Sequence, residues 1–368
     1  MHRLDFRPTL LIAAAYLLSC AWSTAYAQDM PRFSVDPYWP KPLPHNWILG
    51  QIGGIAVDSH DHIWVYQRPR SLTDDERGAA LTPPVSKCCF PAPPVLELDR
   101  QGNLLQAWGG AGEGYQWPEN EHGIFVDAQD NVWLGGNGKG DHQVLKFTRE
   151  GKFLMQIGHA GQTADSNSPT ELGRPALAIV DQATGELYIA DGYKNRRILV
   201  LDAQSGRYKR HWGAFGGKPD DADLGPYDPA APEARQFRPP VHCVRISHDG
   251  LVYVCDRAND RLQVFNKDGG FVTEFVMEAS TRGAGSVWDV AFSEDAGQRY
   301  LYVADGTNNE IRVLDRATGR QVNVVGRPGR YAGEFHWLHA IAADSQGSLY
   351  TGDVDTGKRV QRFVRQRN

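Results

Sequence analysis

The sequence has little of several features that mark common protein classes. It has no run of lysine or arginine and a formal net charge of -5, so it lacks the basic surface that nucleic acids attract. It has only five cysteines, and the adjacent Cys88 and Cys89 do not have the spacing of a zinc finger. The apolar run from Leu10 to Leu18 is too short to span a bilayer. These absences argue against a nucleic-acid partner, a zinc finger and a membrane-spanning helix at residues 10–18.

The first 27 residues predict an export signal. Two arginines precede the apolar run, and Ala25-Tyr26-Ala27 follows it, so we expect cleavage before Gln28. The stretch Leu17-Leu18-Ser19-Cys20 also resembles a lipoprotein cleavage box, and lipidation of Cys20 would tether the domain to a membrane. In either case the domain is expected to be exported, as a periplasmic or secreted protein, with a membrane contact only if Cys20 is lipidated.

Residues 28–368 repeat a unit of four short strands separated by Gly- and Asp-rich turns. The clearest copy runs from Pro239 to Val276. The other copies are Ile48 to Trp108, Trp117 to Gly158, Arg174 to Gly213, Gly285 to Gly326 and Phe335 to Val364. A four-stranded unit cannot bury both of its faces alone, so the copies must pack on one another. Six copies of roughly 40 residues predict one all-β domain, a six-bladed β-propeller.

The last copy shows only three clear strands. Propellers commonly close by letting one chain end complete the blade formed by the other. We therefore expect residues 32–40 to supply the fourth strand. The first copy is interrupted by an insertion at 69–93, and long connections lie at 159–173 and 214–238. Antiparallel pairing predicts that these three segments emerge on the face where the first strands begin.

Aligning the six copies on the end of the first strand places histidine at one position in alternate copies. The residues five positions before that end are Gly53, His122, Ala176, His242, Trp288 and His339. In a closed ring the three histidines would lie about 120° apart around the channel. Three convergent imidazoles with a fourth position open predict a catalytic zinc site. A single histidine is more often structural, but three in one alternating position are not easily a coincidence.

Three further residues are expected on the same face. Arg68 ends the second strand of the first copy, Tyr193 follows the second strand of the third, and Arg257 that of the fourth. A phenol beside a metal and a cation loses its proton more readily, so Tyr193 is a candidate general base. The arginines would grip a substrate carboxylate. Alternatively, Tyr193 packs as an aromatic side chain and the arginines form inter-blade ion pairs.

Other polar residues are expected to be structural. Aspartate recurs at the end of the second strand in most copies, as Asp191, Asp256, Asp305 and Asp353, which indicates a turn or inter-blade contact rather than catalysis. Cys243 and Cys255 fall opposite each other across a hairpin, where an exported protein would have either a disulfide or two buried thiols.

The repeats carry a resemblance to a known family. The segments LYIADGYKNRRILVL, VYVCDRANDRLQVF and LYVADGTNNEIRVL resemble NHL repeats. More narrowly, EHGIFVDAQDNVWL, ADGYKNRRI, VHCVRI and WLHAIAADSQGSLYTGD resemble the peptidyl-α-hydroxyglycine α-amidating lyase domain in order and spacing, over about residues 32 to 368. NHL repeats alone indicate no particular activity. The ordered set of three histidines, a tyrosine and two arginines is more specific.

The resemblance implies a reaction and the residues that perform it. Members of the lyase family cleave the N–Cα bond of a C-terminal α-hydroxyglycine, releasing a peptide amide and glyoxylate. In this sequence the implied zinc ligands are His122, His242 and His339, the implied base is Tyr193, and the implied substrate contacts are Arg68 and Arg257. The implied partner is a small peptide or α-hydroxy amide with a carboxylate.

The sequence departs from the family at several positions. The family has a calcium-binding aspartate directly after the third histidine, and this position is Ala340 here. The carbonyls of Ile55 and Ile124 remain, but without a charged ligand we expect calcium to bind weakly or not at all. Trp337 replaces a pocket methionine, which predicts a reshaped pocket. No copper monooxygenase domain is present to make hydroxyglycine, so another carbinolamide is an alternative substrate.

Two classes of function remain open from the sequence. One is an exported zinc lyase acting on a carbinolamide with a nearby carboxylate. The other is a non-catalytic NHL propeller that binds a peptide, glycan or protein on its loop-rich face.

Overall fold

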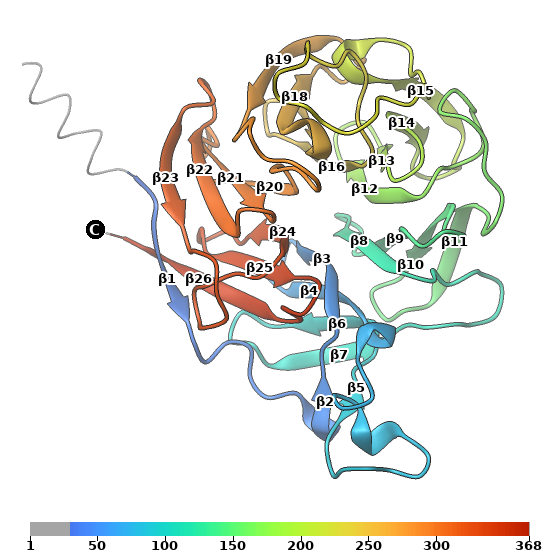
Figure 1. The fold of residues 1–368 in the computed structure, drawn as a ribbon. Helices are drawn as coiled ribbons and strands as arrows, with labels where there is room; N and C mark the ends of the chain where they lie inside the picture. The colour runs from blue at the N-terminus through green and yellow to red at the C-terminus, as the bar shows by residue number, and fades with distance from the viewer. Residues whose placement is uncertain (1–29, 368) are drawn as a thin grey trace, which may run out of the picture.

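In the computed structural model, which describes residues 30–367, six four-stranded antiparallel sheets form a ring (Figure 1). The sheets follow one another around the ring in chain order, as the colours from blue to red show. This confirms the predicted all-β, six-bladed β-propeller. The predicted export signal and Cys20 lie outside the described residues.

All six blades place their strands in the same order from the channel outwards. The innermost strands are β3 (Gln51–Val57), β8 (Glu121–Val126), β12 (Pro175–Asp181), β16 (Val241–Ile246), β20 (Asp289–Phe292) and β24 (Leu338–Ala343). The second strands are β4 (Ile63–Arg68), β9 (Val132–Gly136), β13 (Glu186–Asp191), β17 (Val252–Asp256), β21 (Tyr300–Asp305) and β25 (Leu349–Asp353). The third strands are β6 (Val95–Leu98), β10 (Gln143–Phe147), β14 (Arg197–Asp202), β18 (Arg261–Phe265), β22 (Glu310–Asp315) and β26 (Val360–Gln366). The outer strands are β7 (Leu104–Trp108), β11 (Phe153–Gly158), β15 (Tyr208–Trp212), β19 (Phe271–Val276), β23 (Gln321–Val325) and β1 (Arg32–Asp36).

The ring closes inside the sixth blade. Strand β1 pairs antiparallel with β26, from Arg32 opposite Gln366 to Asp36 opposite Arg362. This pairing covers a sheet edge that would otherwise be open to other chains. The N-terminal stretch therefore supplies the fourth strand of the last blade, as predicted. A short parallel pair, β2 (Trp47–Ile48) and β5 (Phe90–Pro91), ties the insertion to the segment before β3.

The hydrophobic core lies between neighbouring blades. Successive side chains of a strand point to opposite faces, so each sheet offers apolar side chains to both neighbours. Between the first and sixth blades, Ile52 and Ile55 pack with Tyr350, and none of the three is more than 1% exposed. Burying one such side chain stabilises the fold by about 1.5–3 kcal/mol. The packing holds the inner strands in fixed positions around the channel.

The long loops gather on the face where the inner strands begin, which we call the loop face. Arg70 of the insertion donates to the carbonyl of Pro118, just before β8, at 2.8 Å. Lys194 donates to Ala164 in the 159–173 segment at 2.7 Å, and the backbone N–H of Ser166 donates to Asp221 in the 214–238 segment at 2.9 Å. The three long segments therefore share one face, as predicted.

The aspartates that end the second strands are structural, as predicted. Each forms an ion pair with an arginine near the start of the third strand, at N–O distances of 2.7 to 2.9 Å, and the four pairs are Asp191–Arg197, Asp256–Arg261, Asp305–Arg312 and Asp353–Arg359. These carboxylates are at most 1% exposed. They hold adjacent strands together and are not available for catalysis.

On the opposite face, a basic residue at or just after the end of the third strand binds a carboxylate of the preceding blade. Five junctions carry such inter-blade ion pairs, which are Arg100–Asp344, Arg149–Asp58, Lys267–Asp181, Arg316–Asp249 and Arg365–Glu294. The equivalent position in the third blade is Ala203. In the part of the chain described, that junction has no such pair. These contacts were not predicted, although the recurring basic residue after the third strand was a visible signal.

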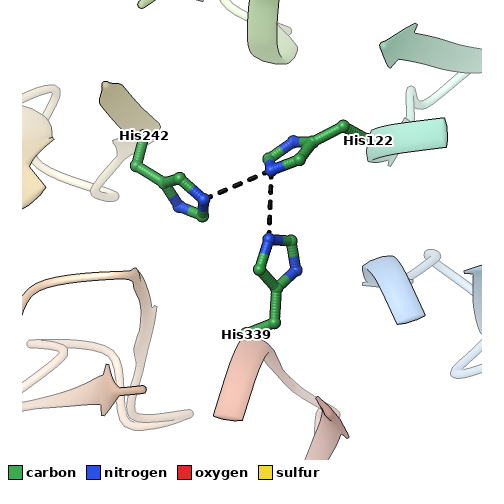
Figure 2. A group of neighbouring side chains, drawn as sticks. All are labelled: His122, His242 and His339. Atoms are coloured by element: carbon green, nitrogen blue, oxygen red, sulfur yellow. Dashed lines mark hydrogen bonds between the residues drawn. The ribbon is translucent and has the colours of Figure 1, made fainter. Parts of the chain in front are cut away.

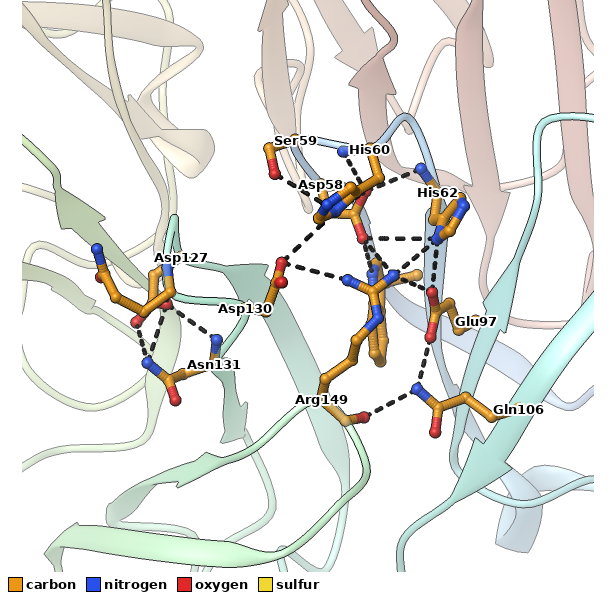
Figure 3. Close-up of polar contacts among 12 residues, drawn as sticks. Asp58, Ser59, His60, His62, Glu97, Gln106, Asp127, Asp130, Asn131 and Arg149 are labelled. Atoms are coloured by element: carbon orange, nitrogen blue, oxygen red, sulfur yellow. Dashed lines mark hydrogen bonds and ion pairs between the residues drawn. The ribbon is translucent and has the colours of Figure 1, made fainter.

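The pair between the first two blades lies in a larger polar cluster (Figure 3). Arg149 contacts Asp58 at 2.9 Å and Asp130 at 3.2 Å, and it also bonds Glu97. Its Nη2 atom lies 2.7 Å from Nδ1 of His62. The guanidinium therefore occupies the middle of a group of carboxylates and an imidazole.

Cys243 and Cys255 form a disulfide between the paired strands β16 and β17. Of the two alternatives, a disulfide or two buried thiols, the structure contains the disulfide. Cys88 and Cys89 are also joined by a disulfide, within the insertion.

Among the described residues, no helix has both the length and the apolar character needed to cross a membrane.

Candidate metal centre

A β-bulge recurs where the inner strands face the channel. The pairing of the first and second strands skips one residue in five blades, at Gly53, Gly123, Ala176, His242 and His339. A bulge interrupts the alternation of a strand and re-aims the side chains beside it. Gly123 is required here, because its φ is +73° and a Cβ atom would lie 2.1 Å from the carbonyl oxygen of Ala176. The bulge falls on the aligned position in four blades and on the residue after it, Gly123, in the second blade, so five inner strands share this irregularity beside the channel.

Three imidazoles converge in the channel from alternate blades (Figure 2). Nε2 of His122 lies 3.2 Å from Nε2 of His242 and 3.0 Å from Nε2 of His339. Ligands at tetrahedral positions around zinc are about 3.3 Å apart, given zinc–nitrogen distances of about 2.0–2.1 Å. The three side chains are at most 3% exposed. The predicted convergence is confirmed, and its spacing suits a single metal ion.

Backbone carbonyls of the odd-numbered blades orient two of the imidazoles. Nδ1–H of His122 donates to the carbonyl of Ala176 at 2.8 Å, and Nδ1–H of His242 donates to that of Trp288 at 2.5 Å. Ala176 and Trp288 occupy the aligned position of the next blade. Such second-shell bonds fix the tautomer that presents the Nε2 lone pair. The buried Nδ1 of His339 has no hydrogen-bond partner.

The histidines are held in the neutral form. Burial lowers the pKa of each imidazole well below its usual value, and the positive charges of Arg68 and Arg257 lower it further. In the tautomer fixed by the backbone, the proton of each ring is on Nδ1. The Nε2 atoms of His122 and His242 are therefore both acceptors and cannot hydrogen-bond to each other. A cation between these lone pairs would satisfy both. The donor set therefore fits zinc, for which neutral imidazole nitrogen is a preferred ligand.

Tyr193 lies beside the histidines. Its hydroxyl is 2.9 Å from Nε2 of His122 and 3.0 Å from Nε2 of His242. Tyr193 follows β13, and its backbone N–H donates to the carbonyl of Arg174 at 3.1 Å. The ring also packs against the neighbouring core. Tyr193 therefore lies beside the histidines, as expected, and it also has the aromatic packing that was its alternative.

Both predicted arginines lie near this tyrosine. The Arg257 guanidinium is 4.2 Å from the ring centre of Trp288 and 5.9 Å from that of Tyr193, and its buried Nε has no partner. Arg68 donates from Nε to the carbonyl of Glu121 and from Nη1 to Gln51, each at 2.8 Å. Neither arginine forms an ion pair with a residue that the structure describes. The alternative interpretation as inter-blade ion pairs is therefore not observed.

Trp288 is a neighbour of the site that was not predicted. Its ring centre lies 5.5 Å from that of His242, 5.7 Å from that of His339 and 5.4 Å from that of Trp337. Its indole N–H donates to the carbonyl of Gly285 at 2.8 Å, which fixes the ring. Trp288 occupies the aligned position of the fifth blade, which was the available signal. The two tryptophans form an aromatic wall beside the metal site.

The Arg149 cluster in Figure 3 contains two other groups with metal-like spacing. One consists of Asp58, His62 and Glu97, and the other of Asp58, His60 and Asp130. Arg149 already bonds Asp58, Glu97 and Asp130 there. A guanidinium cannot lose its proton in a protein, so a permanent cation already lies among these carboxylates.

The described residues form a six-bladed propeller with a buried histidine triad in its channel. No protein-family model matches the sequence. Among curated proteins, NHL repeat-containing protein 3 of Mus musculus is 27% identical over 392 residues, covering 96% of this chain and 95% of that protein.

The names of two further relatives refer to an amidating activity. Peptidyl-glycine alpha-amidating monooxygenase B of Xenopus laevis is 26% identical over 336 residues, covering 87% of this chain and 34% of that protein. Peptidyl-alpha-hydroxyglycine alpha-amidating lyase 1 of Drosophila melanogaster is 26% identical over 272 residues, covering 68% and 46%. The chain thus spans about a third of the monooxygenase and about half of the lyase. It is a distant homologue of NHL-repeat proteins and of amidating lyase domains.

A solved structure supports the fold alone. The chain titled "Streptogramin B lyase structure" matches with a TM-score of 0.52 at 12% identity, covering 91% of this chain and 98% of that chain. The chain is thus a six-bladed propeller with a buried histidine triad and distant similarity to NHL-repeat proteins and amidating lyase domains.

Proposed function

We propose that this protein is a zinc-dependent lyase that cleaves the N–Cα bond of a peptidyl-α-hydroxyglycine or a related carbinolamide. The products are an amide and glyoxylate. The observation that carries the proposal is the Tyr193 hydroxyl, which lies within 3.0 Å of two of the three convergent Nε2 atoms. The distant similarity to amidating lyases supports it.

His122, His242 and His339 would hold the zinc ion, which would supply Lewis acidity to the substrate hydroxyl. Tyr193 would act as the general base that accepts the proton of that hydroxyl. The oxygen then forms a C=O bond while the C–N bond breaks, and the proton passes to the leaving amide nitrogen. The reaction is redox-neutral and consumes no water. The reaction needs no co-reactant, because the proton that Tyr193 takes from the hydroxyl is the one that the leaving amide nitrogen receives.

The arginines would bind and orient the substrate. Arg257 stacks on Trp288 and keeps a buried Nε–H without a partner. A guanidinium fixed in this way is prepared to pair with a carboxylate. Arg68 is tied by two hydrogen bonds, so its charge stays at the site and opposes protonation of the histidines. Holding the carboxylate fixes the hydroxyl carbon close to the base.

The cellular location of the protein is also part of the proposal. The predicted signal at residues 1–27 implies a periplasmic or secreted enzyme, or a lipoprotein anchored through Cys20. The proposed partner is a small peptide or α-hydroxy amide with a carboxylate, and no nucleic acid.

The experiment is to measure bound metal and glyoxylate release from an α-hydroxyglycyl peptide. The Tyr193→Phe variant removes one hydroxyl and none of the imidazoles, so it should keep one zinc per chain while turnover falls about 10²–10⁴-fold. Tyr208→Phe is the matched control, because its hydroxyl contacts His211 on the outer strand β15 and lies outside the site. Unchanged turnover in Tyr193→Phe would remove Tyr193 from the mechanism.

A non-catalytic propeller is the second candidate. The extensive match to NHL repeat-containing protein 3, whose name states no activity, favours it. In that case the histidines would hold a structural metal, and the loop face would bind a peptide, glycan or protein. Metal-loaded protein that releases no glyoxylate from any carbinolamide would favour this function.

A further inference from the structure

A small cavity lies in the channel next to the histidines, which form part of its lining. Its volume is about 20 Å³. One water molecule needs about 10–15 Å³ by this measure, so the cavity has room for about one. Its lining includes Ile55, Ile124 and Ala340, the positions at which the resemblance to the lyase family implies a calcium ion.

The lining also contains a charged pair that the sequence analysis did not single out. Arg245 of β16 and Asp289 of β20 both line the cavity. Nη2 of Arg245 donates to Oδ2 of Asp289 at 2.9 Å, and Nε donates to Oδ1 at 3.2 Å. Nε also lies 3.3 Å from the carbonyl of Val290. The guanidinium therefore bridges two neighbouring blades at the channel wall.

Asp289 has no capacity left for a calcium ion. Besides Arg245, its oxygens accept the backbone N–H groups of Val290 at 2.9 Å and Ile341 at 3.2 Å. Burial raises the pKa of this carboxyl, and the charge of Arg245 opposes that effect. Asp289 is the only carboxylate among the described residues that line the cavity. Calcium requires six to eight oxygen ligands, usually including carboxylates, at about 2.3–2.6 Å.

We propose that the Arg245 guanidinium, held by Asp289, takes the place of a calcium ion in this channel. The Arg245 side chain is a cation that belongs to the chain itself. It links the inner strands of the fourth and fifth blades, so this link does not require a bound metal ion. Arginine keeps its charge at any pH at which the protein folds. The stability of the chain is therefore expected not to depend on calcium. This inference does not rest on the proposed lyase activity.

The test is metal content and thermal unfolding of the full-length protein. Wild type, Ala340→Asp and the double variant Arg245→Ala/Ala340→Asp are dialysed against 1 mM calcium chloride or against a calcium-selective chelator, in the presence of zinc. We expect wild type and Ala340→Asp to bind no calcium and to unfold at the same temperature in both buffers. The double variant regains a carboxylate and loses the competing cation, so it should bind about one calcium and unfold about 5 °C higher in calcium.

Two results would overturn the proposal. The first is wild-type protein that retains about one calcium per chain with a matching rise in unfolding temperature. The second is the same uptake by Ala340→Asp while Arg245 is still present. Both measurements use chains that keep the Arg245–Asp289 pair, so they decide the question even if the double variant does not fold.

Discussion

Two clusters in this molecule have the spacing of a metal site, and they differ in charge. In the channel, three neutral imidazoles point their Nε2 atoms at one another with no carboxylate in the group. Between the first two blades, Asp58, Glu97 and His62 lie equally close together, but the Arg149 guanidinium bonds both carboxylates. The first cluster has lone pairs without a cation, whereas the second already contains one.

The difference shows that spacing alone does not identify a metal site. A group of ligand atoms favours a metal when its lone pairs or charges have no other partner. Arg149 satisfies the carboxylates of one cluster, just as Arg245 satisfies Asp289 in the channel. The histidine triad has no equivalent residue, and it alone combines ligand geometry with an unmet need for a cation among the described clusters.

The largest expected effect comes from removing one ligand in the channel. His242→Ala should reduce bound zinc from one per chain to none, and turnover should fall about 10³-fold or more, because a metal stabilises the transition state by several kcal/mol. Metal analysis and glyoxylate release measure both quantities. His62→Ala in the Arg149 cluster is the control and should keep zinc and turnover. Loss of zinc in His62→Ala, or retention of zinc in His242→Ala, would contradict the assignment of the metal to the histidine triad.

The next effect concerns the stability of the second cluster. Arg149→Met removes the cation and leaves Asp58 and Glu97 buried without it, so the free energy of unfolding should fall by about 3 kcal/mol. Urea titration measures this change, and zinc content should stay the same. Arg77→Met breaks an exposed ion pair with Asp74 and should change stability by less than about 0.5 kcal/mol. Equal losses in the two variants would show that Arg149 contributes no more than a surface pair.

The smallest effect is a pH dependence confined to the second cluster. Burial alone would raise the pKa of Asp58, but hydrogen bonds from Trp64, His62 and His60 and the charge of Arg149 lower it below its usual value of 3.8. A lowered pKa in the folded state stabilises the protein above the unfolded-state value, and this contribution is lost as the pH falls below about 4.

Urea titrations of wild type and Asp58→Asn at pH 6 and pH 3 measure this contribution. The difference in unfolding free energy between the two proteins should shrink at pH 3. A difference that stays constant between the two pH values would show that the charge of Asp58 does not contribute.

The fold and the triad were predictable because the sequence repeats. Each copy contains alternating apolar residues and Gly/Asp turns, so aligning the copies placed His122, His242 and His339 at equivalent positions. Equivalent positions in a ring converge on its axis, and no knowledge of side-chain contacts was needed. The disulfide partners followed from the same logic, since a short turn places Cys243 opposite Cys255.

Features that do not repeat were missed. Arg245 and Asp289 lie 44 residues apart, and no other blade contains such a pair at the channel among the lining residues described. The bulges were missed for another reason, because they depend on which backbone groups pair across two strands. Trp288 was aligned correctly, but its role follows from its contacts with Arg257 and two histidines, which sequence alone does not give.

The alternation of blades with and without a channel histidine limits the number of blades that is compatible with this site. Histidine-bearing blades alternate with blades that lack the histidine, and two of the latter contribute a carbonyl, from Ala176 and Trp288, that orients the ring of the preceding blade. A ring with an odd number of blades cannot alternate in this way, since two members of the same kind would meet at the seam. Gain or loss of a single repeat would thus dismantle the trigonal arrangement even if every remaining blade folded normally.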